Sequence, residues 1–251
     1  MIRLPSYEEI RFRDPPLRRV LCQIKFPTIL SLADGGALLG SFQEAIREHY
    51  PFLQQLQQFS VTISGAESSA PRAMSQGAWQ FADPARQWTI TLAPDALTLE
   101  TERYSSFEDL SVQIGLALRA LVEHVRPGYS TRVGLRYINE IAVNAPDMED
   151  WSKLLNEHWR SILDAGIVGD SVAHWIQNLR LQLEDGTFNV NVGFIPDEAA
   201  RVIIDLDYFD ESQVALSVED TMAKLDRWHE VIHNMFRWSI SGEMLARLEA
   251  K

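Results

Sequence analysis

The stretch Arg132-Val133-Gly134-Leu135-Arg136-Tyr137-Ile138-Asn139 decides the fold class, because its side chains alternate in character. Apolar residues occupy every second position, and the two arginines fall between them. A period of two is typical of a β-strand, and one polar face predicts an antiparallel sheet with helices on a single side. Asn139 falls on the apolar side and therefore needs buried hydrogen-bond partners. Gly134, on the polar side, predicts a β-bulge or the close approach of another backbone.

The same order of elements recurs on the two sides of residue 128. Periodicity and turn residues predict strands in the first half at 20–26, 59–64, 79–81, 88–92 and 97–103, with helices at 38–50 and 106–125. A long hairpin connection is expected at 65–77. The second half has predicted strands at 133–141, 175–183, 188–194 and 202–208, with helices at 148–163 and 217–238. Ser105 or Ser106 is expected to cap the helix that begins at 106, and Asp185-Gly186 is a hairpin turn signal.

Residue-level similarities indicate an internal duplication. Residues 42–50 match 151–159 at a constant offset, and the strand at 97–104 matches 202–209. Chance similarity between elements of one type is the alternative. We therefore predict an α+β fold of two similar β-α-βββ(β)-α halves, residues 1–128 and 129–251, in one compact unit with helices on one face of the antiparallel sheet. This element order resembles the duplicated saddle of TATA-binding-protein-like and helix-grip-like folds, and it implies no function by itself.

Composition and charge narrow the classes of function. The 251 residues are 46% hydrophobic and carry a formal net charge of −12, which disfavours nucleic acid and anionic membranes as partners. No segment approaches the roughly 20 apolar residues that cross a bilayer, and the N-terminus lacks a secretory pattern, so we expect a cytoplasmic protein. Cys22 is the single cysteine, which excludes an internal disulfide and predicts a buried, inert thiol.

The polar positions of the predicted strands form a surface of mixed charge. Arginine offers a planar, bidentate grip on carboxylate or phosphate, and asparagine adds directional donors. This face is a candidate recognition surface for a protein partner or a small anionic ligand, with the alternatives of a solvated face or a homo-oligomer contact. The candidate binding residues are Arg132, Arg136, Glu140, Arg180, Asn189 and Asn191.

The segment His229-Glu230-Val231-Ile232-His233 matches the H-E-x-x-H zinc motif, in which two histidines hold the metal and the glutamate activates water. The sequence offers no good third zinc ligand, because the downstream candidates Glu243 and Glu249 stand at the end of the chain. We therefore expect His229 to pack in the core and Glu230 to face solvent, with a zinc-dependent hydrolase as the alternative. No glycine-rich phosphate loop or nucleophile elbow occurs, and no cofactor is expected.

Several short motifs carry a resemblance to a known family. They are Pro16-Leu17 before the first strand, Trp79-x-Phe81, Tyr104-x-x-Phe107 at the helix start, the Arg-x-Gly-Leu-Arg-Tyr-x-Asn string and Phe236. With them, nearly the whole chain resembles an uncharacterised, sporadically distributed family of prokaryotic proteins of similar length. The resemblance implies no activity. The favoured hypothesis is a non-enzymatic binding protein, and an accessory component of a prokaryotic defence system is a further alternative.

Overall fold

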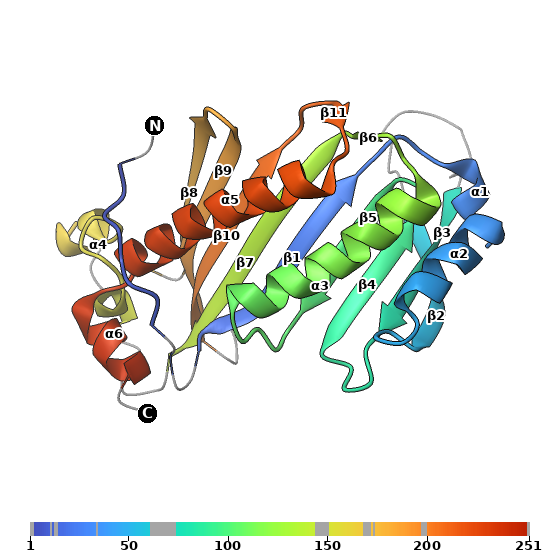
Figure 1. Ribbon diagram of the computed structural model, residues 1–251. Coiled ribbons are helices and arrows are strands. Elements are labelled where there is room, and N and C mark those ends of the chain that lie inside the picture. The colour runs from blue at the N-terminus through green and yellow to red at the C-terminus, as the bar shows by residue number, and fades with distance from the viewer. Residues whose placement is uncertain are drawn as a thin grey trace, which may run out of the picture.

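A large antiparallel sheet with helices against one face organises the molecule (Figure 1). The structure is a computed structural model, which describes residues 3–10, 12, 15–33, 35–60, 74–143, 151–167, 172, 174–196 and 200–249. Within these residues the predicted α+β class is confirmed. No helix of the described ranges is both long and apolar enough to cross a membrane.

Within the described part of the chain, nine strands form one sheet in the order β2-β3-β4-β5-β1-β7-β10-β9-β8, and β6 pairs with β11 in a separate short ribbon. The strands are β1 (Leu17–Lys25), β2 (Phe52–Ser60), β3 (Met74–Ala82), β4 (Trp88–Ala93), β5 (Ala96–Thr101), β6 (Tyr129–Ser130), β7 (Arg132–Ala142), β8 (Trp175–Leu183), β9 (Gly186–Ile195), β10 (Arg201–Asp210) and β11 (Val214–Ala215).

The two central strands are β1 and β7, and their register fixes which side chains face the helices. Cys22 lies opposite Leu135, and Val20 lies opposite Tyr137, which in turn faces Leu206 of β10. All five side chains are buried. Burial raises the pKa of Cys22 to about 12, so its thiol stays protonated at neutral pH. The alternation read from the sequence therefore describes the real faces of the sheet.

Two long helices cover the middle of the sheet (Figure 1). The helices are α1 (Leu30–Ala33), α2 (Ala37–Ile46), α3 (Phe107–Ala120), the π-helical turn η1 (Leu121–Val125), the 3₁₀ turn η3 (Trp151–Leu154), α4 (Ser161–Asp164), α5 (Val218–Ser239) and α6 (Gly242–Glu249). The hydroxyl of Ser106 accepts from the backbone N–H of Asp109, and Ser217 caps α5 on Asp220 in the same way. The predicted start of α3 is thereby confirmed.

The predicted helix at 148–163 is wrong where the structure describes it. Residues 151–154 form one 3₁₀ turn, and a short helix begins only at Ser161. Asn156 explains the break, because its Oδ1 accepts from His158 N and its Nδ2 donates to the Trp238 carbonyl of α5. The apolar residues of this segment still pack in the core, but they do so from an irregular chain. Their burial produced a helix-like pattern without a helix.

Boundaries in the first half also differ from the prediction, and one helix of the second half was not predicted. The strand expected at 59–64 begins at Phe52, and its residues 61–64 lie outside the described part. Residues 74–77 of the hairpin connection expected at 65–77 already belong to β3, and residues 65–73 lie outside the described part. Helix α6 had no predicted counterpart. Each miss lies at the edge of the sheet or at the end of the chain.

Gly134 has a different role from the predicted one. The β7–β10 register runs through it without a shift, so no bulge is present there. A Cβ atom at Gly134 would lie 2.5 Å from Nη1 of Arg132, whose guanidinium crosses the glycine. The missing side chain thus makes room for Arg132, which reaches the ring of Phe209 at 4.7 Å.

The hairpin glycine Gly186 should tolerate no side chain. Its φ is +153°, and an added Cβ would lie 2.5 Å from the carbonyl oxygen of Phe209. We expect Gly186→Ala to lower the free energy of unfolding by about 2–4 kcal/mol, measured by urea denaturation. Gly242→Ala is the matched control, because nothing lies within 4 Å of its added Cβ, and it should change stability by less than about 1 kcal/mol. Equal losses in both variants would contradict the described hairpin.

Candidate functional site

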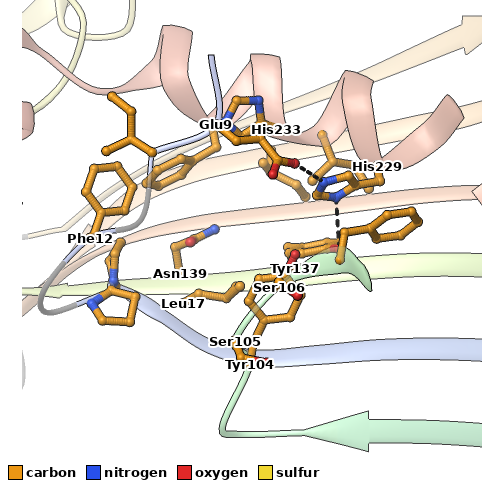
Figure 2. A pocket seen from close by; sticks show the side chains of 17 residues that line it. Glu9, Phe12, Leu17, Tyr104, Ser105, Ser106, Tyr137, Asn139, His229 and His233 are labelled. Atoms are coloured by element: carbon orange, nitrogen blue, oxygen red, sulfur yellow. Dashed lines mark hydrogen bonds and ion pairs between the residues drawn. The ribbon is translucent and has the colours of Figure 1, made fainter. Parts of the chain in front are cut away.

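A cavity of about 310 Å³ lies on the helix side of the sheet, where the N-terminal segment, the β5–α3 loop, β7, β10 and α5 meet (Figure 2). Its apolar wall consists of Ile10, Phe12, Pro15, Pro16, Leu17, Phe107, Leu206, Ile232 and Phe236. Its polar groups are Glu9, Tyr104, Ser105, Ser106, Tyr137, Asn139, His229 and His233. Apolar surface with a few convergent polar groups is the usual composition of a small-molecule site.

A row of hydrogen bonds crosses the polar end of the pocket (Figure 2). The hydroxyl of Tyr137 lies 3.1 Å from Nδ1 of His229, and Nε2 of the same ring lies 2.9 Å from Oε1 of Glu9. Tyr104 extends the row through a hydrogen bond to Tyr137. Phe107 stacks flat on the imidazole, with 4.0 Å between ring centroids. The His229 ring is therefore held at both nitrogens and on one face.

Burial sets the protonation of this row. It raises the pKa of Tyr137 well above the usual value, and the pKa of Tyr104 likewise, so both phenols keep their protons at neutral pH. A carboxylate can only accept, so Nε2 of His229 carries the proton of its 2.9 Å contact with Oε1 of Glu9. The N–H of Nε2 points at the carboxylate of Glu9. His229 thus presents one oriented donor to an anionic acceptor.

His233 follows one helical turn after His229 and also lines the pocket. Burial lowers its pKa below the usual value, and nearby His229 and Arg237 lower it further, against an opposing effect of Glu9. The ring is therefore neutral at pH 7. The neutral polar groups of the cavity thus include His233 and the phenols of Tyr104 and Tyr137.

Asn139 fulfils the expectation of a satisfied buried amide. Its side chain is buried, and Nδ2 donates to the carbonyl of Ile204 at 3.1 Å. Because this donor is fixed on β10, the residue holds a constant orientation at the pocket wall (Figure 2). It adds a second rigid polar group to the row of Tyr137 and His229.

The N-terminal segment is attached along α5. The N–H of Tyr7 donates to Oδ1 of Asn234, and Phe12 meets the edge of Phe236 at 6.3 Å between centroids. The guanidinium of Arg237 lies over the rings of Tyr7 and Phe12, at 5.5 and 6.0 Å. Its Nε and Nη1 are buried and find no hydrogen-bond acceptor in the described part of the chain. A positive charge therefore stands beside the pocket wall.

The H-E-x-x-H residues occupy two different environments. His229 is buried with both nitrogens engaged, whereas Glu230 is exposed on the outer side of α5, as the helical pattern predicts. Among the described residues, no group of three or more His, Cys, Asp or Glu side chains is placed to hold a metal ion. The zinc-hydrolase hypothesis stays a prediction.

The six candidate binding residues lie on the opposite face of the sheet from the pocket. Arg136 forms a bidentate pair with Asp205, at 2.7 and 2.8 Å, and Asn191 donates to the same carboxylate at 3.2 Å. Arg132 and Arg180 both lie over the ring of Phe209.

The remaining contacts of this face are also internal. Arg132 reaches Asp207 at 3.4 Å, and burial raises the pKa of that carboxyl although both Arg132 and Arg136 oppose the shift. Glu140 stands 3.8 Å from Arg201, and Asn189 pairs with Asp207 and Arg180 in the ladders. The structure thus joins Arg136 to Asn191 and Arg132 to Arg180 in two clusters. Whether they bind a partner stays a prediction.

Several residues of the short sequence motifs line the pocket, although the sequence alone did not identify them as a site. Pro16-Leu17, Tyr104, Phe107, Tyr137, Asn139 and Phe236, which carry the family resemblance, all line the cavity. Their convergence is the signal that could have located the site. Glu9 had no such signal, because it stands in a segment without periodicity. No protein-family model and no curated protein matches this chain, so function is inferred from the geometry of the pocket.

The ion pair of Arg136 with Asp205 on the sheet face should stabilise the fold. The side chain of Asp205 is 12% exposed and that of Arg136 is 45% exposed. Removing the arginine leaves a largely buried carboxylate with one amide donor, so we expect Arg136→Ala to lower the free energy of unfolding by about 2–3 kcal/mol. The control Arg180→Ala removes an exposed cation–π contact and should cost less than about 1 kcal/mol in the same denaturation series. A loss at Arg180 as large as that at Arg136 would contradict this assignment.

The lowered pKa of His233 predicts a pH dependence of stability. The unfolded residue titrates near 6.5, whereas the folded one titrates below this value. As the pH falls below 6.5 the unfolded state takes up a proton first, so the free energy of unfolding decreases until the folded pKa is reached. His233→Gln should reduce this decrease, measured by denaturation about one pH unit above and below 6.5. An NMR titration of the His233 ring with a midpoint above 6.5 would overturn the prediction.

Proposed function

We propose that this chain is a binding protein whose pocket takes one small molecule with an apolar body and a polar head. The observation that carries the proposal is the fixed row Tyr104–Tyr137–His229 at one end of an otherwise apolar cavity. Apolar walls supply affinity for the body of a ligand, and the oriented polar groups select its head. The cavity volume of about 310 Å³ lies at the lower end of the range of small-molecule sites.

The state of the titratable groups favours binding over covalent catalysis. The phenols of Tyr104 and Tyr137 have raised pKa values and are poor bases and nucleophiles at neutral pH. The imidazole of His229 is engaged at both nitrogens. Such groups recognise a ligand by hydrogen bonding without changing it.

A duplicated architecture fits this site. We infer that residues 1–128 and 129–251 are related halves, as in TATA-binding-protein-like folds. Supporting this, β1-β5-β4-β3 and β7-β10-β9-β8 run outward from the central pair in mirrored order, and α3 and α5 follow the corresponding strands β5 and β10. Residues of both halves line the pocket, so the pocket lies where the two halves meet. Membership in the sporadically distributed prokaryotic family is proposed on the motifs that line it, and a defence role stays a prediction.

The sheet face that neither α3 nor α5 covers (the uncovered face) is a second candidate surface, for a protein partner or another copy of the chain. In its favour, α3 and α5 both lie on one face of the sheet (Figure 1). The alternation of β7 and its register with β10 place the Arg132 and Arg136 clusters on the other face. Their charges are paired within the sheet, so a partner would bind by shape and by the polar rim.

The pocket proposal is tested with N-phenylnaphthylamine, a neutral apolar dye that fluoresces in apolar sites. We expect saturable binding of one dye per chain, because the cavity walls are largely apolar. Leu17→Trp places an indole in the cavity and should weaken dye binding at least about tenfold. Leu21→Trp is the matched control, since Leu21 is half-buried on the same strand but does not line the pocket.

The two tryptophan variants separate pocket binding from surface binding. Dye affinity that is lost in Leu17→Trp and kept in Leu21→Trp supports the proposal. Equal affinity in both variants, or no saturable binding to the unmodified chain, would rule the pocket out as a binding site. Circular dichroism of both variants shows that each is folded.

A further inference from the structure

The carboxylate of Glu9 stands on the head-group end of the pocket, although it belongs to the N-terminal segment. Its side chain is 60% exposed, whereas the His229 side chain that it meets is 10% exposed. The carboxylate therefore reaches from the solvent side to a buried donor at the cavity wall (Figure 2). A flexible, half-solvated glutamate is a replaceable partner for that donor.

The donor itself is fixed. The hydroxyl of Tyr137 is hydrogen-bonded to Nδ1 of His229, and the ring of Phe107 stacks on the imidazole. The N–H of Nε2 therefore keeps its direction when the carboxylate of Glu9 moves away from it. An imidazole N–H buried without an acceptor is costly, and an anionic acceptor makes the strongest hydrogen bond to it. Any occupant of the pocket that withdraws Glu9 must supply such an acceptor.

The surroundings of this donor favour an anion followed by an apolar body. Arg237 places a positive charge beside Phe12, and this charge contributes to the lowered pKa of His233 in the pocket. The acidic residues of the first turn of α3, Glu108 and Asp109, raise the pKa of Tyr104, and Asp109 is bonded to the hydroxyl of Ser105. Beyond the donor, the walls are the rings and aliphatic side chains of Phe12, Leu17 and Phe236.

We propose that the ligand is an amphipathic monocarboxylic acid, whose carboxylate replaces that of Glu9 on Nε2 of His229 while its apolar chain or ring fills the cavity. This inference rests on the proposed binding function and names its ligand class. Glu9 then acts as a tethered competitor, which satisfies the donor in the empty protein. An organic ammonium ion is the rival ligand, because aromatic rings with a carboxylate form cation sites. It is disfavoured here, since a cation that drew Glu9 away would leave the N–H of Nε2 without an acceptor, and since the guanidinium of Arg237 stands nearby.

Displacement of bound N-phenylnaphthylamine by decanoate, decanol and decylamine tests the ligand class on the full chain. Each of the three has ten carbon atoms in a straight chain, so the apolar tails are of nearly equal length and the head groups differ. We expect decanoate to displace the dye at roughly tenfold lower concentration than decanol, and decylamine to be the weakest of the three.

Two variants test the role of Glu9 and of the fixed donor. Glu9→Gln keeps the shape and removes the competing charge, so it should strengthen decanoate binding by roughly tenfold and leave decanol unchanged. Glu8→Gln is the matched control: it removes the same charge from an exposed neighbour that does not line the pocket, and it should behave as the unmodified chain. Tyr137→Phe frees Nδ1 and should reduce the preference for decanoate over decanol.

Each of the other outcomes contradicts a specific part of the proposal. Equal displacement by decanoate and decanol, with no effect of Glu9→Gln, would overturn the carboxylate assignment and leave the pocket as an apolar binding site. Strongest displacement by decylamine that is lost in Glu9→Gln would make Glu9 a ligand group for cations and also overturn it. If the dye itself fails to bind the pocket, both the ligand class and the binding function fall together.

Discussion

The pairing of β1 with β7 is the contact on which the rest of the structure depends. It joins the strands of the first half to those of the second in one sheet, and its register places Val20 against Tyr137. A slip of one residue would turn Tyr137 to the uncovered face and Arg136 into the core. The apolar alternation of both strands excludes that slip, because it would bury a guanidinium among the helices. The phenol that orients His229 is therefore set by strand register, not by the helix that carries the histidine.

Burying the row of Tyr104, Tyr137 and His229 between the helices and the sheet costs desolvation free energy. The hydrogen bonds within the row offset this cost. Buried phenol and imidazole groups lose water, and each must find a partner within the protein. Tyr104, Tyr137 and His229 satisfy one another in sequence, which leaves one donor, on Nε2, directed out of the row. The opposite face solves the same problem with charges: Asp205 is buried and is held by Arg136 and Asn191. The polar row thus ends in one donor that meets the exposed Glu9, whereas the polar groups of the opposite face are paired with one another.

Sequence reasoning succeeded where one local physical cause controls the structure. Strand alternation, the Ser106 cap and the burial of Asn139 depend on neighbours in sequence or on one face of a strand. It failed at 148–163, where the apolar spacing is helical but the hydrogen bonds of Asn156 to distant Trp238 decide the backbone. It also failed for the pocket, because Glu9 and His229 are 220 residues apart and only the fold brings them together. The arginines of β7 were assigned to the right face, but their partners on β10 could not be known without the register.

The tethered carboxylate has a thermodynamic consequence for any ligand of this site. If Glu9 occupies Nε2 about 90% of the time, a competing carboxylate has its apparent affinity reduced about tenfold. The same contact keeps the buried donor satisfied when the pocket is empty, so it stabilises the unliganded fold. Tyr7 on Asn234 and Phe12 on Phe236 hold the segment to α5 on either side of Glu9. Glu9 can therefore leave His229 by a side-chain movement alone, while the segment continues to cover the cavity. A ligand then has to outcompete one solvated carboxylate and does not have to displace the whole N-terminal segment.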